Sequence, residues 1–158
     1  MAQARAGLEI VVFDLGQQRF GLMIDDVERV LRAVALTPLP NAASLVEGLF
    51  CMAGAPIAVL DIRKRFGLPP KPIDVDDLLI VTRAGDRRVA IRAERVAGVV
   101  KIDPAGVRDA KSIAAMDPQI SGVATLSDGV VLVHDPGAFL TQAEAVELDR
   151  LIPEPTTP

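Results

Sequence analysis

The chain has 158 residues, 50% of them hydrophobic, and a formal net charge of −4 at pH 7. This mildly acidic balance disfavours nucleic-acid binding, because neutralising phosphates requires a clustered basic surface. A single cysteine, Cys51, excludes an internal disulfide framework. No apolar stretch reaches the ~18 residues of a membrane-spanning helix, and the first residues lack the apolar region of a secretory signal. We therefore expect a cytoplasmic protein without direct membrane insertion.

The first half of the sequence is typical of short strands separated by turns. Two apolar runs flank Gly16-Gln17, which predicts a hairpin over residues 8–23. One or two helical turns and another strand are expected over residues 24–36, followed by a proline-containing loop at 37–45. Two strands then join through Ala53-Gly54-Ala55, and a short helix after Asp61 ends before a proline-rich link.

The second half repeats this order of elements. Residues 77–92 predict a second hairpin, residues 93–98 a helical turn and residues 98–102 a strand, before a long loop at 104–119. Two strands follow, joined at Ser127-Asp128-Gly129. The last element is a helix over 141–152, in which Thr141 and Glu144 form a capping box and three apolar residues share one face: Ala145, Leu148 and Ile152.

Glycines and aspartates recur at nearly constant offsets between the halves. Gly16 and Gly85 are 69 positions apart, and both Gly48–Gly122 and Asp61–Asp135 are 74 apart. The chain is therefore interpreted as a duplicated unit of about five short strands, each unit too small to bury a core alone. We predict a mainly β fold comprising one domain (8–152), two five-stranded barrels (about 8–68 and 76–140) with a shared hydrophobic core, short connecting helices, the C-terminal helix, and flexible tails at 1–7 and 153–158.

The reactive side chains favour structural roles over catalysis. Asp61 and Asp135 each end a strand before a short helix, which predicts helix N-caps. The only histidine, His134, is expected to be structural and hydrogen-bonded, and Cys51 in LFCM to be a buried thiol, although a dyad between them is not excluded by the sequence. The sequence contains no nucleotide-binding glycine motif and no metal-ligand cluster, so we expect no cofactor and no metal.

Charged runs are interpreted as solvated surface. This applies to the basic clusters at 63–65 and 87–88, which lack interleaved aromatic residues, and to the acidic run at 74–77, which lacks the glycine and distal glutamate of a calcium loop. What remains is a non-catalytic binding module that acts through apolar grooves and strand edges.

An ordered set of segments resembles the CheW family, the adaptor proteins of bacterial chemotaxis arrays. The resemblance covers about residues 8–152 and is carried by LEIVVFDLGQQRFGLMIDDVERVL, TPLP, VEGLFCMAGAPIAVLDIRKRFGL, IVTRAGDRRVAIRAERVAGVV and ISGVATLSDGVVLVHDPGAFL. It implies SH3-like barrels, no catalytic activity, and coupling of methyl-accepting chemoreceptors to the histidine kinase CheA. It further implies that the receptor tip lies in a groove between the barrels, that the kinase regulatory domain pairs barrel end to barrel end, and that other CheW-like proteins can be partners at membrane-associated arrays.

The resemblance also implies a set of partner-binding residues, with departures from the family pattern. Ala53 stands where the family usually has arginine, Arg29 stands where it usually has an acid, and Ala58 replaces a proline. We hypothesise that the surface around Arg29 is electropositive and that Gly48 and Gly54 allow a partner backbone to approach. The candidate partner-binding residues are Val27, Arg29, Gly48, Leu49, Met52, Ala53, Gly54 and Val81.

Two other functions stay open at this point. The same fold could serve a pilus-type or other alternative chemosensory pathway, or act as a polar localisation factor. A small-ligand protein or enzyme is the third class, which a deep pocket around a perturbed His134 or Cys51 would support.

Overall fold

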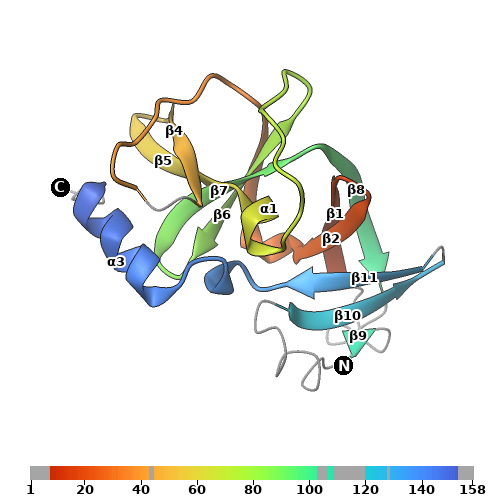
Figure 1. Cartoon of the computed structure of the whole chain (residues 1–158). Helices are drawn as coiled ribbons and strands as arrows, with labels where there is room; N and C mark the ends of the chain where they lie inside the picture. The colour runs from red at the N-terminus through yellow and green to blue at the C-terminus, as the bar shows by residue number, and fades with distance from the viewer. Residues whose placement is uncertain (1–7, 43–44, 103–106, 109–119, 128, 153–158) are drawn as a thin grey trace.

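The computed structural model describes residues 8–42, 45–102, 107–108, 120–127 and 129–152 (Figure 1). The tails at 1–7 and 153–158, predicted to be flexible, lie outside the described residues, as does most of the loop at 104–119. Four short or terminal helices are described: η2 (Ile24–Asp26), α1 (Ile62–Arg65), η4 (Pro136–Ala138) and α3 (Gln142–Leu151). The described strands are β1 (Leu8–Leu15), β2 (Gln18–Met23), β3 (Val27–Arg32), β4 (Val46–Met52), β5 (Ala55–Leu60), β6 (Leu78–Ala84), β7 (Arg87–Ala93), β8 (Arg95–Ile102), β9 (Val107–Arg108), β10 (Ile120–Leu126) and β11 (Gly129–His134).

The strands form two mixed sheets, and each sheet combines both halves of the chain. The six-stranded sheet has the order β8-β1-β2-β11-β10-β9, and the five-stranded sheet has the order β3-β6-β7-β5-β4. The hairpin β1–β2 therefore belongs with the later strands, and the hairpin β6–β7 belongs with the earlier ones. The mainly β fold with a C-terminal helix is confirmed. The two barrels were predicted to consist of residues 8–68 and 76–140 respectively, whereas in the structure each sheet contains strands from both ranges. Each half exchanges its first hairpin with the other.

The exchange preserves the duplication strand for strand. When β1, β2, β3, β4 and β5 are matched to β6, β7, β8, β10 and β11, the two sheet orders become identical apart from β9, which has no counterpart among the described strands of the other sheet. The parallel pairs correspond as well, since β11 pairs with β2 and β5 pairs with β7. Register shifts occur at matching places, between Val27 and Arg29 and between Val46 and Gly48 in the first half, and near Gly98 and Gly122 in the second. Such bulges bend a strand and sharpen its twist.

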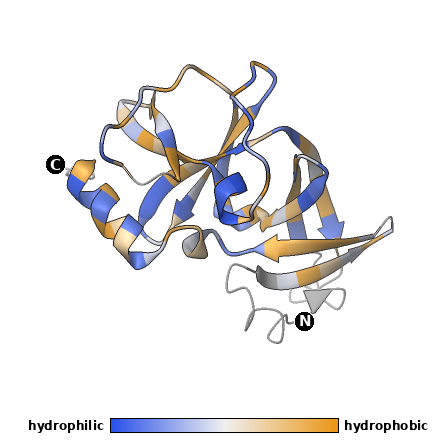
Figure 2. Ribbon diagram, viewed as in Figure 1, coloured by the Kyte–Doolittle hydropathy of each residue, from blue (hydrophilic) through white to orange (hydrophobic). Residues whose placement is uncertain are grey.

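Three groups of buried apolar side chains form the core. Alternation along the strands, visible as changing colours in Figure 2, sends one face of each sheet toward the other sheet and the opposite face into a smaller cluster. The largest cluster draws on both sheets, which confirms the shared core; its members include Phe13, Phe20, Leu60, Ile80, Ile91, Phe139 and Leu148. The smaller clusters are centred on Val59 and Val81 in the five-stranded sheet and on Val12 and Val131 in the six-stranded sheet.

The three predicted N-caps are present. Asp61 accepts a hydrogen bond from the backbone N–H of Arg63 at 3.2 Å, and Asp135 accepts one from Gly137 at 2.9 Å. Thr141 and Glu144 form the reciprocal capping box at the start of α3. Leu148 and Ile152 of this helix are buried in the shared core with Ala145 packed beside them, so the predicted apolar stripe docks as expected.

One predicted helical segment is shorter than the sequence indicated, and the turn predicted at 93–98 is not helical. Only Ile24–Asp26 is helical before β3, and β8 begins at Arg95, where a helical turn was predicted. Both segments lie beside a pairing partner, β6 for β3 and β1 for β8, and ladder formation overrides weak local helix preference.

The basic clusters that were predicted to be solvated are partly buried instead. Arg63 and Arg87 are both almost fully buried. Arg87 donates to Asp149 Oδ1 at 2.8 Å and to the carbonyl of Ile152 at 2.6 Å, which fastens α3 to β7. The prediction was wrong because ion pairs with residues far along the chain offset part of the cost of burying these guanidinium groups. The spacing of residues in the sequence does not show such partners.

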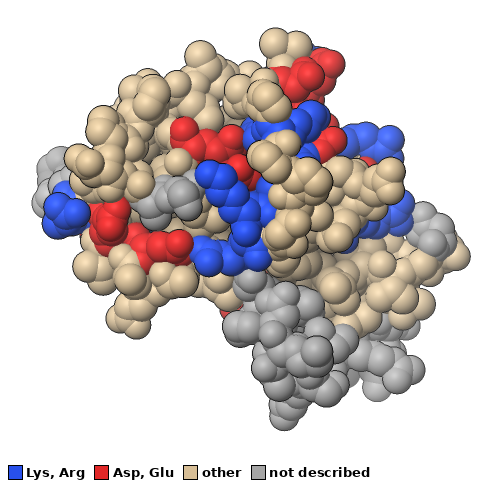
Figure 3. Space-filling model, viewed as in Figure 1, with Lys and Arg blue, Asp and Glu red and all other residues tan. Residues whose placement is uncertain are grey.

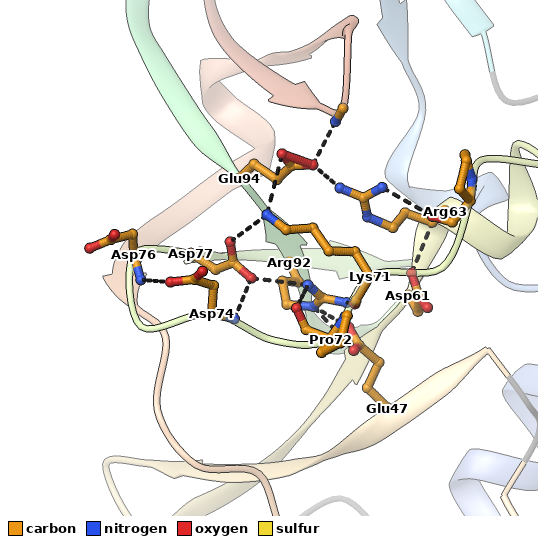
Figure 4. A network of polar contacts seen from close by, with 12 residues as sticks. Glu47, Asp61, Arg63, Lys71, Pro72, Asp74, Asp76, Asp77, Arg92 and Glu94 are labelled. Carbon is orange, nitrogen blue, oxygen red and sulfur yellow. Dashed lines mark hydrogen bonds and ion pairs between the residues drawn. The ribbon is translucent and has the colours of Figure 1, made fainter.

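A polar network fastens the proline-rich link between the halves (Figure 4). Arg92 is 4% exposed; it donates to Glu47 Oε2 at 2.8 Å, to Asp77 Oδ2 at 3.0 Å and to the carbonyl of Lys71 at 2.6 Å. Although burial lowers the pKa of Arg92, the hydrogen bonds and charges of Glu47 and Asp77 outweigh it and raise that pKa above its ordinary value. The acidic run at 74–77 was predicted to be solvated, and this was wrong for Asp77, which is 2% exposed.

The second arginine of the network joins the link to both sheets. Arg63 donates to the carbonyl of Pro69 at 3.2 Å and pairs with Glu94. Glu94 also accepts the backbone N–H of Gly16 at 2.7 Å and lies 3.4 Å from Lys71 Nζ. The link is therefore held through its carbonyl oxygens by buried cations from α1 and β7.

Replacing Arg92 by alanine should cost about 3–5 kcal/mol of unfolding free energy, because Asp77 and Glu47 would be left in the interior without their cation. Arg88→Ala is the matched control; Arg88 pairs with Glu28 at 3.0 Å on the surface, and its loss should cost no more than about 1 kcal/mol. Urea unfolding monitored by circular dichroism measures both. Equal effects would contradict the structural role assigned to the network.

Candidate protein-interaction site

The turn between β4 and β5 presents Ala53 and Gly54 to solvent. Both have positive φ, 52° and 81° respectively. Positive φ at both central residues is the geometry of a two-residue hairpin turn that follows the strand twist, and it favours asparagine and glycine. Ala53 thus occupies the left-handed region with a β-carbon, at a cost of about 1–2 kcal/mol. A defined backbone conformation, rather than a loose loop, presents this part of the candidate site.

Arg29 is exposed on the outer strand β3 of the same sheet. Its neighbour Glu28 occupies the bulge of β3 and pairs with Arg88 at 3.0 Å. Among the described residues, no carboxylate forms an ion pair with Arg29. Glu28 is therefore engaged with a residue of the same molecule, whereas the electropositive surface expected around Arg29 stays a prediction.

Gly48 is buried beneath the chain's own segment 36–37. Thr37 and Leu49 exchange backbone hydrogen bonds of 2.8 and 2.7 Å, which brings this segment against β4. A β-carbon on Gly48 would lie 2.8 Å from the Thr37 carbonyl oxygen and 3.0 Å from Leu36 Cβ. The close backbone approach predicted at this glycine is thus present within the molecule rather than shown for a partner.

The remaining candidates differ in accessibility. Met52 and Val81 are buried in the apolar cluster of the five-stranded sheet. Val27 and Leu49 are half-buried against the shared core. Of the eight predicted residues, only Arg29, Ala53 and Gly54 are exposed enough to contact a partner with most of their side chain or backbone. The buried ones shape the surface from below.

Cys51 was predicted to be buried, and this was wrong. The thiol is exposed, while its neighbours Phe50 and Met52 are buried. An apolar run such as LFCM does not indicate which face of a strand each residue occupies. Because the register of β4 places Phe50 and Met52 inward, Cys51 points outward.

His134 is buried among aromatic rings, as a structural histidine should be. Its ring centroid lies 4.9 Å from that of Phe20 and 5.1 Å from that of Phe66, and its Nδ1 is 2.9 Å from the carbonyl oxygen of Leu132. Within the described part of the chain, no group of three or more His, Cys, Asp or Glu side chains could hold a metal ion. No described helix is long and apolar enough to cross a bilayer.

The charged surface is mixed rather than divided by sign. On the face shown in Figure 3, Lys and Arg lie beside Asp and Glu. An ion pair of Arg65 with Glu144 connects α1 to α3. The figure shows no broad basic patch on this face.

Asp26 lies where the two halves of the molecule meet. Its backbone carbonyl accepts a hydrogen bond from the Thr82 hydroxyl. Partial burial, together with the nearby charges of Asp135 and Asp25, raises the pKa of the Asp26 carboxyl above its ordinary value. Ionising this carboxyl therefore costs more free energy in the folded protein than in the unfolded chain.

Comparisons with known proteins agree on one family. The model of the CheW-like domain matches residues 9–144. The chain is 22% identical over 153 residues to a protein named chemotaxis protein CheW from Klebsiella aerogenes, covering 96% of this chain and 92% of that one. It is 32% identical over 106 residues to protein FrzA of Myxococcus xanthus, covering 67% of this chain and 66% of FrzA.

The fold is also that of a solved structure. The crystal structure of the scaffolding protein TtCheW from Thermoanaerobacter tengcongensis superimposes with a TM-score of 0.78 at 24% identity, covering 87% of this chain and 90% of that one. At this identity the likeness supports the fold.

Replacing Gly48 by alanine should lower the unfolding free energy by about 1–3 kcal/mol, because the added methyl group would press on the Thr37 carbonyl oxygen. Thermal unfolding measures this. A variant as stable as the parent would show that segment 36–37 moves aside freely.

Replacing Asp26 by asparagine should stabilise the fold near pH 7 and lose that effect in acid. A carboxyl whose folded pKa is raised favours the folded state below its unfolded pKa of about 3.9, and this contribution disappears as pH rises through the folded value. Melting temperatures of Asp26→Asn and the parent across this range provide the measurement, with the exposed Asp86→Asn as control. A gain that is the same at every pH would contradict the raised pKa.

Proposed function

Because the chain belongs to the CheW-like domain family, whose members are non-catalytic adaptors, we propose that it couples methyl-accepting chemoreceptors to a CheA-type histidine kinase. It would do so in the cytoplasm, recruited to membrane-associated receptor arrays. The family match over residues 9–144 carries the proposal. Such a protein acts by binding, and a core shared by both sheets supports this role.

The five-stranded sheet supplies the candidate partner surface. Arg29 on β3 and the Ala53-Gly54 turn offer a cation and an exposed backbone, while Val27 and Leu49 add partly exposed apolar area. Gly48, Met52 and Val81 hold these elements in place from the interior. The partners in this proposal are the kinase regulatory domain, the cytoplasmic receptor tip and other CheW-like proteins.

The test measures binding of the purified chain to the kinase regulatory domain and to the receptor tip from the same cell, followed by receptor-dependent kinase activity. Binding to both with a gain of kinase control supports the proposal. Binding to neither overturns it. The departures at Arg29 and Ala53 favour an alternative role for the same fold, either as a scaffold of a pilus-type or other chemosensory pathway or as a polar localisation factor. Binding only to the kinase or receptor of such a pathway would identify the scaffold role.

Replacing Arg29 by glutamate should weaken the partner complex on the order of tenfold, because an acid on the partner would then face a like charge. Calorimetric titration measures the dissociation constant, and Arg32→Glu on the same strand is the matched control. An unchanged or tighter complex would count against an acidic partner group at this position.

A further inference from the structure

A cavity lies between α3, η4 and the turn from β6 to β7, a region that Figure 1 shows beside the start of α3. Its volume of about 440 Å³ falls in the range of about 300–1,000 Å³ that small-ligand sites occupy. Two glycines, Gly85 and Gly137, lie in its lining. Aliphatic side chains form another part of the lining: Leu140, Ala145 and Val146. Val146 is 60% exposed, so the cavity opens to solvent.

The internal duplication shows what occupies the matching place in the first half. Gly137 stands where the first half has Arg63: the two are 74 positions apart, the offset that also relates the N-cap aspartates, and each is the second residue after its cap. Gly85 likewise matches Gly16 at the offset of 69. The lining of the cavity therefore contains the counterparts of a turn glycine and of an arginine.

In the first half, this place is filled by the guanidinium group of Arg63 (Figure 4). Arg63 is 4% exposed and pairs with Glu94, whose carboxylate also accepts the backbone N–H of Gly16 at 2.7 Å. The carbonyl oxygen of Pro69 accepts a hydrogen bond from Arg63 Nη1 at 3.2 Å, so the link also contacts this group. The first half thus contains its own cation between the short helix and the hairpin turn.

The second half contains the matching carboxylates without that cation. Asp135 and Asp25 stand at the positions of Asp61 and Glu94, and Asp26 follows directly. Asp25, Asp26 and Asp135 are exposed, and no described Lys or Arg forms an ion pair with any of them. After partial burial, the charges of Asp135 and Asp25 help to raise the pKa of Asp26, so these carboxylates repel one another. A cation placed beside η4 would relieve this repulsion.

The cavity borders on this negative charge. A β-carbon on Gly137 would lie 3.3 Å from Asp135 Oδ1 and 3.8 Å from the backbone nitrogen of Gly85. A side chain entering at Gly137 therefore meets the carboxylate of Asp135 directly. Asp149 also lines the cavity; its side chain is 65% exposed, and its Oδ1 already accepts a hydrogen bond from Arg87 at 2.8 Å. The cavity thus places a carboxylate that no described cation neutralises beside aliphatic surface, which suits a cation on an apolar stem.

We propose that this cavity binds a guanidinium group on an aliphatic stem, the group that Arg63 supplies in the first half. The guanidinium donates to the Asp135 carboxylate, and the stem packs against Ala145 and Val146 of α3. Its planar set of five donors matches a carboxylate better than the compact ammonium of lysine does. The group can belong to a free compound or to an arginine side chain of another protein, and two probes of equal charge distinguish these sources.

NMR titration of the purified chain measures this binding. Butylguanidinium represents a free compound, N-acetylarginine methylamide represents an arginine within a polypeptide, and pentylammonium is the control cation of equal charge. Butylguanidinium should shift the amide signals of Gly85 and Gly137 saturably and bind severalfold more tightly than pentylammonium. An arginine derivative that binds at least as tightly as butylguanidinium identifies another protein as the source, and one that binds markedly more weakly identifies a free compound.

Filling the cavity from within provides a second measurement. The φ of Gly137 lies outside the left-handed region, and the atom nearest to its β-carbon position is Asp135 Oδ1, so the substitution Gly137→Arg fits the backbone. It should raise the melting temperature by about 2–4 °C, the shift expected of one new ion pair in a chain of this length. It should also abolish butylguanidinium binding. Gly137→Ala is the matched control, because it leaves the cavity open and should bind like the parent.

Removing the charge tests the partner of the guanidinium group. Asp135→Asn keeps a residue that can cap η4 but removes the carboxylate, so it should weaken butylguanidinium binding severalfold. Asp74→Asn is the control, because Asp74 is an exposed acid before β6 and outside the lining of the cavity. Its effect should be nil. Melting temperatures close to that of the parent show that the Asn and Ala variants are folded.

The proposal is overturned if neither guanidinium probe shifts the signals of Gly85 and Gly137, or if pentylammonium binds as tightly as butylguanidinium. It is also overturned if Gly137→Arg or Asp135→Asn binds butylguanidinium as the parent does. No kinase or receptor is present in these titrations, so their outcome is separate from that of the proposed function.

Discussion

The exchange of hairpins between the two halves is the constraint on which the rest of the structure depends. β2 pairs in parallel with β11 and β7 pairs in parallel with β5, so each sheet requires strands from both ends of the chain. Neither half can satisfy its backbone groups alone, and the shared core forms only when both are in place. For an adaptor this has a direct consequence, because surfaces on the two sheets are held at a fixed orientation by one core.

Because the hairpins are exchanged, the link between the halves must run from α1 to β6 along one defined path. Here Leu68 packs against the shared core, and hydrogen bonds from two buried arginines hold the residues that follow. Arg63 and Arg92 bind carbonyl oxygens at three positions of the link, Pro69, Lys71 and Pro72. A guanidinium group has five donors with fixed directions, so its hydrogen bonds form only when the carbonyl oxygens of the link lie at particular positions. Apolar contacts alone would allow the link to shift along the surface. Through Asp77 the same network also holds Asp74 and Ala33 beside the end of β3.

The sequence was sufficient for features that are local and periodic. Alternation predicted the strands, the offsets between Gly16 and Gly85 and between Asp61 and Asp135 predicted the duplication, and cap chemistry predicted the helix starts. The sequence did not show which sheet each hairpin joins. Hydrophobic alternation along a strand is the same whether its hairpin pairs with its own half of the chain or with the other half. Burial of Arg63 depends on Glu94, 31 positions away, and the outward side of Cys51 depends on register. For the candidate site, the motif gave its positions, but only the fold separates exposed Arg29 from buried Val81.

The bulge in β3 explains why Glu28 and Arg29 point in different directions. A bulge inserts one residue without a partner on the opposite strand, and residues on its two sides then face differently. Glu28 occupies that extra position and reaches Arg88 on β7. The acid of this segment is thus retained but turned toward the molecule itself, and Arg29 takes the outward position. Ala53, in the turn between β4 and β5, carries no charge. On the proposed partner surface Arg29 is then a cation that no described carboxylate neutralises, and electrostatic selection among partners should follow from its sign.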